Sequence, residues 1–442
     1  MRQTDEARQE YNKARNKLRR ETRKALKDHE REIAKCAKTE PKKFWKYINS
    51  KRKCNIGISD LMDSSGKEYK TDHEKANALK VFFETVFIEE SDSNIPQVKN
   101  KTSTIVNKIN IDMEDVKKRL TNLKSDKSMG PDNISPRILK ELGEELGYII
   151  SKIFQESINT GEVPKIWKRA NVSAIYKKGS KSNPSNYRPI SLTCVLCKVL
   201  EGIIRKVILE HLQENNLVSN KQFGFIPKRS TTLQLINVIE KWQTLLDNGE
   251  NVDVIYCDIM KAFDQVPRKR LLCKVETYGI GGNLLKWIDS FLMNRKMTVV
   301  INGLSSEEGS VTSGVPQGSV LGPLLFVIYM NDLPANITSQ LYMFADDTKT
   351  FRQVNNYLDC ENLQEDLDKL SEWSKVWLLR FHPEKCSVMH LGNTNTKYNY
   401  FLNGQQLGKT STEKDLGVIV DDNLNFEQHI NEKISKARQM WG

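Results

Sequence analysis

The sequence contains no hydrophobic run long enough to cross a membrane. Its longest apolar stretch centres on Leu324–Met330, far short of the roughly 20 residues of a membrane-spanning helix, and it predicts a buried helix. The N-terminus is charged and has no apolar segment behind it, so no secretory signal is visible. We expect an intracellular protein, in the nucleus, the cytoplasm or both, that is neither secreted nor bound to a membrane.

Clustered metal-binding cysteines and histidines are missing as well. The chain has 8 cysteines and 6 histidines, and only Cys194 and Cys197 stand at a metal-like or redox-like spacing. No second Cys/His pair completes a zinc site, so we interpret the two as reduced core thiols. The glycine-rich loop Ser313–Ser319 lacks the Gly-Lys-Ser/Thr of a Walker loop. No repeat is visible that would indicate a solenoid or a propeller.

Positive charge is concentrated near the N-terminus. Residues 1–53 carry 19 Lys/Arg against 8 Asp/Glu, a net charge of +11 out of +12 for the whole chain. This asymmetry indicates a polyanionic partner. Residues 5–38 contain neither Gly nor Pro, and their few apolar residues recur at helical spacing. A long, mostly solvated helix is therefore predicted here.

Aromatic residues and lysines are interleaved just after this helix. Cations can contact phosphates while a ring stacks on a base, so the segment offers candidate nucleic-acid-binding residues. These candidates are Lys42, Lys43, Trp45 and Lys46. The alternative is that the aromatic side chains dock the helix onto the rest of the protein. The two interpretations are compatible.

Hydrophobic periodicity predicts helices and strands along the remaining chain, which is long enough for two or three subdomains. The predicted helices cover residues 76–88, 113–123, 136–160, 284–293 and 358–378. The predicted strands cover residues 167–177, 252–258, 298–302 and 308–312, and a strand–turn–strand surrounds Asp346.

A two-stranded finger with a cationic tip is predicted around Lys177–Lys181. The strand over 167–177 enters this basic turn, and the segment that begins at Tyr187 leads back from it. Such a tip suits a triphosphate, whose oxygens an arginine can grip in a bidentate manner. The alternative is a hairpin loop that serves only solubility.

Three acids follow apolar strands. Asp258 ends the strand over 252–258, and Asp346 and Asp347 end the apolar run that starts at Leu341. Adjacent carboxylates repel one another and are costly to bury without a cation, and oxygen-only ligands favour Mg²⁺. If the strands pair, the three carboxylates form the ligand set for two Mg²⁺ ions in phosphoryl transfer. A solvated turn and a metal-dependent hydrolase are the alternatives, although hydrolases often add histidine ligands.

Eight blocks, in order, resemble the reverse transcriptase of non-LTR (LINE-type) retrotransposons, of the jockey and chicken-repeat kind. The blocks are residues 123–139, 170–192, 222–231, 258–264, 314–326, 344–347, 373–386 and 416–418. The resemblance implies an α+β right-hand polymerase with fingers, an antiparallel palm sheet, the start of a thumb and a long helical N-terminal extension. It implies an RNA-directed DNA polymerase that uses an RNA template, a DNA primer or target, dNTPs and two Mg²⁺ ions, with Mn²⁺ as an alternative.

The resemblance also implies roles for individual residues. Lys385 resembles the lysine that protonates departing pyrophosphate, and Phe263 resembles the aromatic gate that excludes a ribose 2′-hydroxyl. The implied catalytic residues are Asp258, Asp346, Asp347 and Lys385. The implied metal-binding residues are Asp258, Ile259, Asp346 and Asp347, with Asp347 in an assisting role. The implied nucleotide-binding residues are Arg188, Lys177, Phe263, Gln317 and Gly318.

Two departures from the family pattern stand out. His382 replaces the usual Asn before the Pro-x-Lys turn, which is expected to loosen the turn that positions Lys385, and Ala174 replaces a common Pro. A group II intron-type or RNA-synthesising polymerase of the same fold is a further alternative, which the bulk of Phe263 disfavours.

The resemblance divides the chain into five segments. They are a basic helical extension (1–53), a connecting segment (54–110), an N-terminal fingers extension (111–157), the reverse transcriptase domain (158–422) and a shortened start of the thumb (423–442). Nothing in the chain resembles the endonuclease domain that the family carries upstream. We therefore expect a fragment or degraded copy, and an inactive or domesticated RNA-binding remnant is the alternative function.

Overall fold

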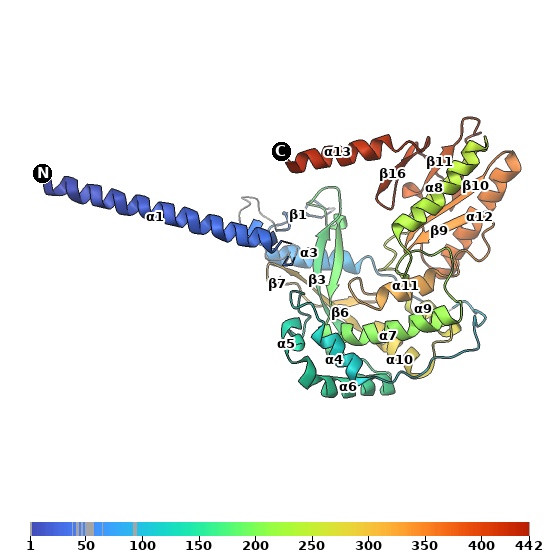
Figure 1. Ribbon diagram of the computed structural model, residues 1–442. Coiled ribbons are helices and arrows are strands. Elements are labelled where there is room, and N and C mark those ends of the chain that lie inside the picture. Colours follow the sequence, from blue (N-terminus) through green and yellow to red (C-terminus); the bar gives the residue numbers. More distant parts are fainter. Residues whose placement is uncertain are drawn as a thin grey trace. The chain divides into compact units, whose positions relative to one another are not determined.

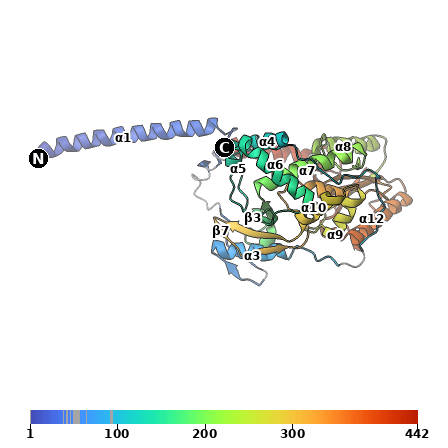
Figure 2. The same cartoon turned by 90° about the horizontal axis from the view of Figure 1, so that it is seen from below.

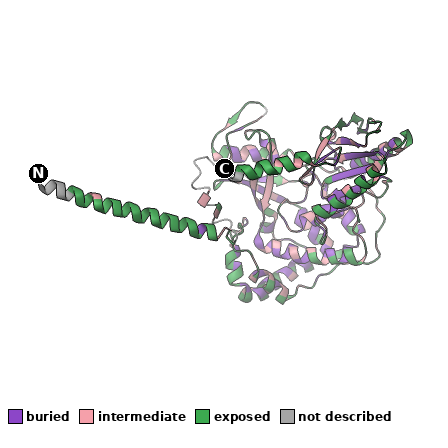
Figure 3. Ribbon diagram, turned by 45° about the horizontal axis from the view of Figure 1, so that its top comes forward, coloured by how far each residue is buried: buried purple, intermediate pink, exposed green. Residues whose placement is uncertain are grey.

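The computed structural model describes residues 2–37, 39–40, 44–45, 47–48, 57–63, 65–91 and 95–441. The chain divides into two compact units, Met1–Asp60 and Leu61–Gly442. The first unit contains helix α1, Arg2–Lys35, which confirms the long helix predicted from the sequence. α1 is exposed along nearly its whole length, as the green ribbon in Figure 3 shows, and Ile33 is a buried exception.

The aromatic segment after α1 is only partly described. Tyr47 donates a hydrogen bond to the Glu30 carboxylate at 2.8 Å, and its ring meets the ring of His29 edge-on. Tyr47 therefore packs on α1 itself. Trp45 is half exposed beside Phe44. The predicted nucleic-acid contacts Lys42, Lys43 and Lys46 lie outside the described residues.

The second unit combines two sheets with a set of helices (Figure 1). Its helices are α3 (Asp72–Glu84), α4 (Met113–Thr121), α5 (Pro136–Glu141), α6 (Gly143–Thr160), α7 (Val195–Glu214), α8 (Thr231–Asp247), α9 (Arg268–Thr277), α10 (Gly282–Leu292), α11 (Gly322–Met330), α12 (Tyr357–Trp377) and α13 (Glu427–Trp441). α11 is buried along its length, as its sequence predicts. Over the described residues, no helix is both long and apolar enough to traverse a bilayer.

One predicted helix is interrupted. The sequence predicts a continuous helix over residues 136–160, but the structure has α5 and α6 separated by a turn at Leu142. α6 packs against α4, and the two lie side by side in Figure 2. A Cβ atom at Gly143, the first residue of α6, would approach the Thr121 side chain to 2.9 Å. The predicted helix is therefore interrupted where the start of α6 approaches α4 closely. Hydrophobic periodicity does not reveal such a tertiary contact.

The finger sheet consists of β3 (Arg169–Tyr176), β4 (Tyr187–Leu192), β6 (Arg295–Ile301), β7 (Leu304–Ser305) and β8 (Gly309–Val311). β3 and β4 pair antiparallel, which confirms the predicted two-stranded finger. β3 also pairs parallel with β6. β6 and β8 form the predicted hairpin, and the short β7 pairs with β6 ahead of β8. The finger is therefore one edge of a wider sheet.

The palm sheet has the strand order β14-β11-β5-β10-β9. Its strands are β5 (Val252–Cys257), β9 (Gln340–Phe344), β10 (Asp347–Gln353), β11 (Ser387–Leu391) and β14 (Gly408–Lys409). Every pair is antiparallel except β11 with β14. α8 covers one face through Val238 and Trp242, and α12 packs on the other face through Leu363 and Leu367 (Figure 1).

Three two-stranded sheets complete the second unit. They are β1 (Leu61–Met62) with β2 (Glu68–Tyr69), β12 (Phe401–Leu402) with β13 (Gln405–Gln406), and β15 (Thr412–Asp415) with β16 (Val418–Asp421). β15 and β16 pair antiparallel and form a hairpin before α13. Val420 of this hairpin belongs to the same apolar cluster as α8.

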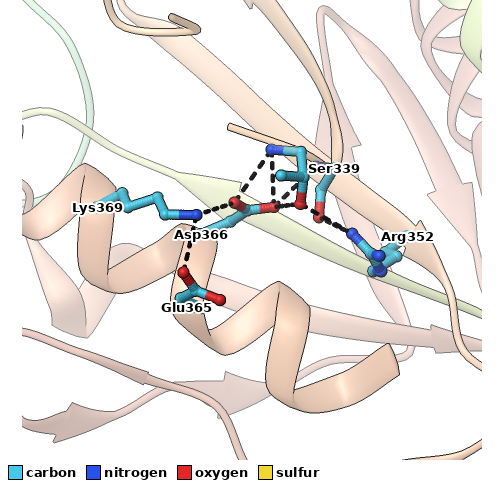
Figure 4. Close-up of polar contacts among 6 residues, drawn as sticks. Ser339, Arg352, Glu365, Asp366 and Lys369 are labelled. Carbon is cyan, nitrogen blue, oxygen red and sulfur yellow. Dashed lines mark hydrogen bonds and ion pairs between the residues drawn. The ribbon is translucent and has the colours of Figure 1, made fainter. Parts of the chain in front are cut away.

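A buried carboxylate fixes the start of β9. Asp366 of α12 is fully buried and accepts hydrogen bonds from the backbone amides of Thr338 and Ser339 at 2.7–3.2 Å. Arg352 of β10 donates to the hydroxyl groups of the same two residues, and Lys369 forms an ion pair with Asp366 (Figure 4). These contacts anchor the strand that leads to Asp346.

Candidate active site

The palm sheet brings the three carboxylates to one edge. β5 and β10 run antiparallel with Cys257 opposite Thr348. Asp258 therefore leaves β5 where Asp347 begins β10. Asp346 lies in the turn between β9 and β10. The sequence patterns predict this convergence, and the register of the strands produces it.

The carboxylates repel one another. Burial raises the pKa of Asp347 to about 6, and repulsion from Asp346 and Asp258 adds to the effect. Burial also raises the pKa of Asp346, with a further contribution from Asp258, while the charges of Arg188 and Lys177 oppose the rise. Carboxylates under this repulsion gain from a bound cation.

The turn that carries Asp346 is held from outside the sheet. Ala345 has φ = +59°, a left-handed conformation that is unfavourable for a residue with a side chain. Oε1 of Gln222, a fully buried residue, accepts hydrogen bonds from the amides of Gly224 and Ala345 at 2.7 and 2.9 Å. A Cβ atom at Gly224 would lie 2.4 Å from the Ala345 nitrogen. Gln222 and Gly224 fall in a family-like block, but sequence reasoning assigned them no role.

Asp258 is held against the segment that carries Lys385. The Asp258 carbonyl accepts from the His382 amide at 2.8 Å, and the Asp258 amide donates to Sγ of Cys386 at 3.3 Å. Nζ of Lys385 lies 3.6 Å from the Asp258 carboxylate. The His382 carbonyl accepts the amides of Lys385 and Cys386 at 2.9 and 3.1 Å. With His382 in place, the turn before β11 is thus closed by hydrogen bonds.

Several cations lie near the carboxylates and near one another. Lys177 of the finger tip interacts electrostatically with Asp258 and is repelled by Arg188 and Lys385. Burial lowers the pKa of Lys177, and this repulsion lowers it further. Burial lowers the pKa of Lys261 as well; the charge of Asp264 opposes this change, and repulsion from Lys385 and Arg188 adds to it. Lys261 was not among the predicted residues, because a lysine in a turn carries no recognisable pattern. Cations crowded in this manner favour a polyanionic ligand.

Phe263 stands five residues after Asp258 and is fixed by other rings. It stacks on Phe326 of α11, with ring centroids 4.5 Å apart and planes at 16°. Phe225 meets it edge-on at 6.1 Å and follows Gly224, the residue that touches the Asp346 turn. Phe263 is therefore linked to the edge that carries the carboxylates through the loop that begins at Gln222.

Gln317 and Gly318 lie between the Phe263 turn and the finger. Nε2 of Gln317 donates to both carboxylate oxygens of Asp264 at 3.0 Å. Burial raises the pKa of Asp264 to about 6, and the hydrogen bonds from Gln317 partly offset the rise. The Gln317 carbonyl accepts the Ser191 amide of β4 at 2.7 Å, and a Cβ atom at Gly318 would lie 2.4 Å from the Ser191 carbonyl oxygen. The glycine-rich loop thus joins the fingers to the palm.

A cavity of about 350 Å³ opens beside Asp258 and Asp347. Residues from the finger tip, the palm sheet and the β15–β16 hairpin line it. They include Lys177, Lys178, Asp258, Asp347, Lys385, Glu413, Lys414 and Leu416. The cavity is thus lined by both acidic and basic side chains.

The donor atoms at this edge fit Mg²⁺. In the described part of the chain, no three Asp, Glu, His or Cys side chains form a ready-made metal centre. Mg²⁺ does not need one, because it is usually held by one or two carboxylates and completes its shell with water and substrate phosphates. The carboxylates of Asp258 and Asp346 supply oxygen ligands only, which favours a hard divalent ion over Zn²⁺.

Comparison with known proteins agrees with this geometry. Residues 175–420 match the family described as reverse transcriptase (RNA-dependent DNA polymerase). The chain is 30% identical to the RNA-directed DNA polymerase from mobile element jockey of Drosophila melanogaster. The aligned region spans 347 residues, which is 75% of this chain and 38% of that protein. It is 31% identical to the jockey polymerase of Drosophila funebris, covering 72% of this chain and 36% of that protein.

A third relative extends over more of the chain. The probable RNA-directed DNA polymerase from transposon X-element of Drosophila melanogaster is 28% identical over 411 residues, 89% of this chain and 45% of that protein. The chain spans less than half the length of each of these relatives. The family match covers more than half of the chain and includes all three carboxylates, both strands that carry them and the finger tip. The chain therefore belongs to the reverse transcriptase family, among those of non-LTR retrotransposons.

Proposed function

We propose that the chain is an RNA-directed DNA polymerase that adds dNTPs to a primer 3′-hydroxyl on an RNA template. The observation that carries the proposal is the meeting of Asp258, Asp346 and Asp347 at one edge of the palm sheet, with cationic side chains from the finger and from the turn before β11 beside them. A triphosphate and a divalent ion bound together would neutralise both groups of charges.

The reaction is a displacement at the α-phosphorus of the dNTP. The primer 3′-oxygen forms a bond to the phosphorus, the bond to pyrophosphate breaks, and the 3′-hydroxyl proton passes to solvent. Two Mg²⁺ ions, or Mn²⁺ in their place, supply the positive charge that favours the attacking and leaving oxygens. Asp258 and Asp346 would hold them, Asp347 would assist, and Ile259 would contribute its backbone carbonyl.

The cations have distinct parts in this reaction. Arg188 and Lys177 bind the phosphate oxygens of the incoming nucleotide, and Lys261 adds a further positive charge beside them. Lys385 protonates departing pyrophosphate. Its side chain is half exposed and its ammonium lies 3.6 Å from the Asp258 carboxylate, so it could leave that contact and follow the phosphate.

Sugar selection is assigned to Phe263. The stack on Phe326 holds the ring in one orientation, and the bulk of the ring would exclude a 2′-hydroxyl. Gln317 and Gly318 support the nucleotide from the glycine-rich loop. The hydrogen bonds between Gln317 and Asp264 fix this loop to the turn that carries Phe263.

The N-terminal helix is assigned to RNA binding. One face of α1 presents lysines and arginines at intervals of three or four residues, so their side chains form a continuous ridge. The ridge consists of Lys13, Lys17, Arg20, Lys24, Lys27, Arg31 and Lys35, all exposed. Over this length the helix rises about 33 Å, enough to follow several phosphates of one strand. Trp45, with Lys42, Lys43 and Lys46, would extend the contact.

The segment boundaries are part of the same proposal. The basic extension is placed at residues 1–53, the connecting segment at 54–110, the fingers extension at 111–157, the polymerase domain at 158–422 and the start of the thumb at 423–442. The compact unit that ends at Asp60 supports the first boundary approximately.

Primer extension tests the proposed activity. The purified chain should extend a DNA primer on an RNA template with dNTPs and Mg²⁺, and Asp346→Asn should not. Binding of the same primer–template is measured in parallel by fluorescence anisotropy. If the unmodified chain binds but makes no more product than Asp346→Asn, the inactive RNA-binding remnant is the correct description.

A further inference from the structure

Two cysteines face each other across adjacent strands of the palm sheet. Cys257 is the last residue of β5, and Cys386 directly precedes β11. The strands are antiparallel with Ser387 opposite Tyr256, so the next pair in the same register is Cys386 with Cys257. Both cysteines are free and almost fully buried, and their thiols are hydrogen-bonding partners.

This placement suits a disulfide bond. Residues directly opposite each other in an antiparallel pair have Cα atoms about 4.5–5.5 Å apart, and disulfides join Cα atoms that are about 4.4–6.8 Å apart. The two cysteines can therefore be joined without a large movement of either strand. A small oxidant can also reach them, because Cys257 lines the cavity of about 350 Å³ beside Asp258 and Asp347.

The immediate neighbours of the two cysteines belong to the proposed catalytic machinery. Cys257 precedes Asp258 in the chain, and Cys386 follows Lys385. Sγ of Cys386 also accepts the hydrogen bond from the Asp258 amide at 3.3 Å. A disulfide has an S–S length of about 2.05 Å, much shorter than the separation of two thiols in contact, so its formation would draw Sγ of Cys386 away from that amide and shift Asp258.

Packing alone does not account for the position of this pair. A buried cysteine usually acts as a small apolar side chain, and Cys360 of α12 fits that description, with the Tyr400 hydroxyl as its polar partner. Cys257 and Cys386 differ from Cys360 in two respects. They face each other, and each stands next to a residue assigned to the reaction.

We propose that Cys257 and Cys386 form a reversible disulfide when a peroxide enters the active-site cavity, and that this bond stops DNA synthesis by displacing Asp258. The effect on synthesis rests on the proposed polymerase function, whereas the formation of the bond does not. A misplacement of about 1 Å at a catalytic site can cost about a hundredfold in rate, so a small shift of Asp258 is sufficient.

The chemistry needs hydrogen peroxide and the two thiols. The sulfur of Cys257 attacks one peroxide oxygen, the O–O bond breaks, and the thiol proton leaves with the other oxygen as water. The sulfur of Cys386 then attacks the sulfenic acid on Cys257, the S–O bond breaks, and the hydroxide leaves with the proton of Cys386 as a second water. Two thiols are thereby oxidised to one disulfide, and the peroxide is reduced to two water molecules.

Peptide mapping and primer extension test the proposal together. The purified chain is treated with hydrogen peroxide, the excess is removed with catalase, and free thiols are alkylated. Trypsin places the two cysteines in peptides 242–261 and 386–397, which should be found linked. The rate of primer extension should fall by about a hundredfold, and dithiothreitol should restore the rate and separate the peptides. Oxidised methionine needs a reductase, so this recovery attributes the loss to sulfur–sulfur chemistry.

Two double variants separate this pair from other oxidised groups. Cys257→Ala with Cys386→Ser cannot form the bond, and serine can still accept the Asp258 amide, so this variant should keep most of its own untreated rate after peroxide. Cys194→Ala with Cys197→Ala is the matched control, because these cysteines are also buried neighbours, at the start of α7. It should be inactivated like the unmodified chain. Circular dichroism establishes that each variant is folded.

Three results would overturn the proposal. They are the absence of the linked peptide after peroxide treatment, a linked peptide without loss of rate, and equal inactivation of the folded Cys257→Ala/Cys386→Ser variant. Failure of the polymerase function is distinguishable, because the unmodified chain would then extend no primer before treatment. In that case the linked peptide alone decides whether the two cysteines form a redox site.

Discussion

The substitution Gln222→Leu should remove the hydrogen bonds that hold the turn before Asp346. The substitution keeps the approximate volume of the side chain but removes the oxygen that accepts the amides of Gly224 and Ala345 at 2.7 and 2.9 Å. Each buried amide left without a partner costs about 1–3 kcal/mol. The free energy of unfolding should therefore fall by about 2–6 kcal/mol, a large fraction of the total stability of a typical domain.

Urea unfolding followed by tryptophan fluorescence measures this loss. Gln234→Leu is the matched control, because Gln234 of α8 is equally buried and neither atom of its amide has a hydrogen-bond partner in the described structure. Replacing an unpaired buried amide should leave stability unchanged or raise it. The reasoning is refuted if the two substitutions cost the same, or if Gln222→Leu costs less than about 1 kcal/mol.

Three further predictions follow from the site, the core and the basic extension. Phe263→Ala should raise ribonucleotide incorporation relative to dNTP by about tenfold or more, measured as the ratio of kcat/KM values; an unchanged ratio contradicts the gate. Burial lowers the pKa of Lys274 from 10.5 to about 8. Between these pH values only the unfolded chain keeps the proton, so the free energy of unfolding should rise with pH by about 3 kcal/mol relative to Lys274→Met. Urea unfolding of both chains at several pH values measures this, and an equal change of stability with pH in the two chains contradicts it. Deleting residues 1–53 should weaken RNA binding. The slope of the logarithm of the binding constant against the logarithm of salt concentration should become shallower by about 0.7 for each lost phosphate contact. An unchanged slope contradicts a role of α1 in RNA binding.

The strands and the carboxylates are predictable from sequence for a simple reason. A strand buried on both faces reads as a continuous apolar run, so β5 and β9 are visible without a structure. Each run ends at an acid. β5 also contains the buried Asp253, whose carboxylate accepts hydrogen bonds from Asn395 and Tyr400. The sequence leaves the pairing of these strands open, and the structure shows that β5 pairs with β10.

The supports of the site are not predictable in the same way. Gln222 acts through two backbone amides that lie 2 and 123 residues away, and no spacing rule connects them. Lys349 resembles any solvated lysine in a strand, although its ion-pair partner Asp415, 66 residues later, buries it. The end of α5 at Glu141 depends on the approach of Gly143 to α4. Each case depends on a tertiary contact that local pattern cannot contain.

Single-turnover primer extension by aspartate variants tests the central claim most directly. If Asp258 and Asp346 hold the same ions, Asp258→Asn and Asp346→Asn should each slow the chemical step by about a thousandfold or more, and the double variant should be no slower than either alone, as for residues that act as a unit. Asp347→Asn should be the mildest of the three. Losses that multiply in the double variant, with primer–template binding intact, would contradict a shared metal site at this edge of the palm sheet.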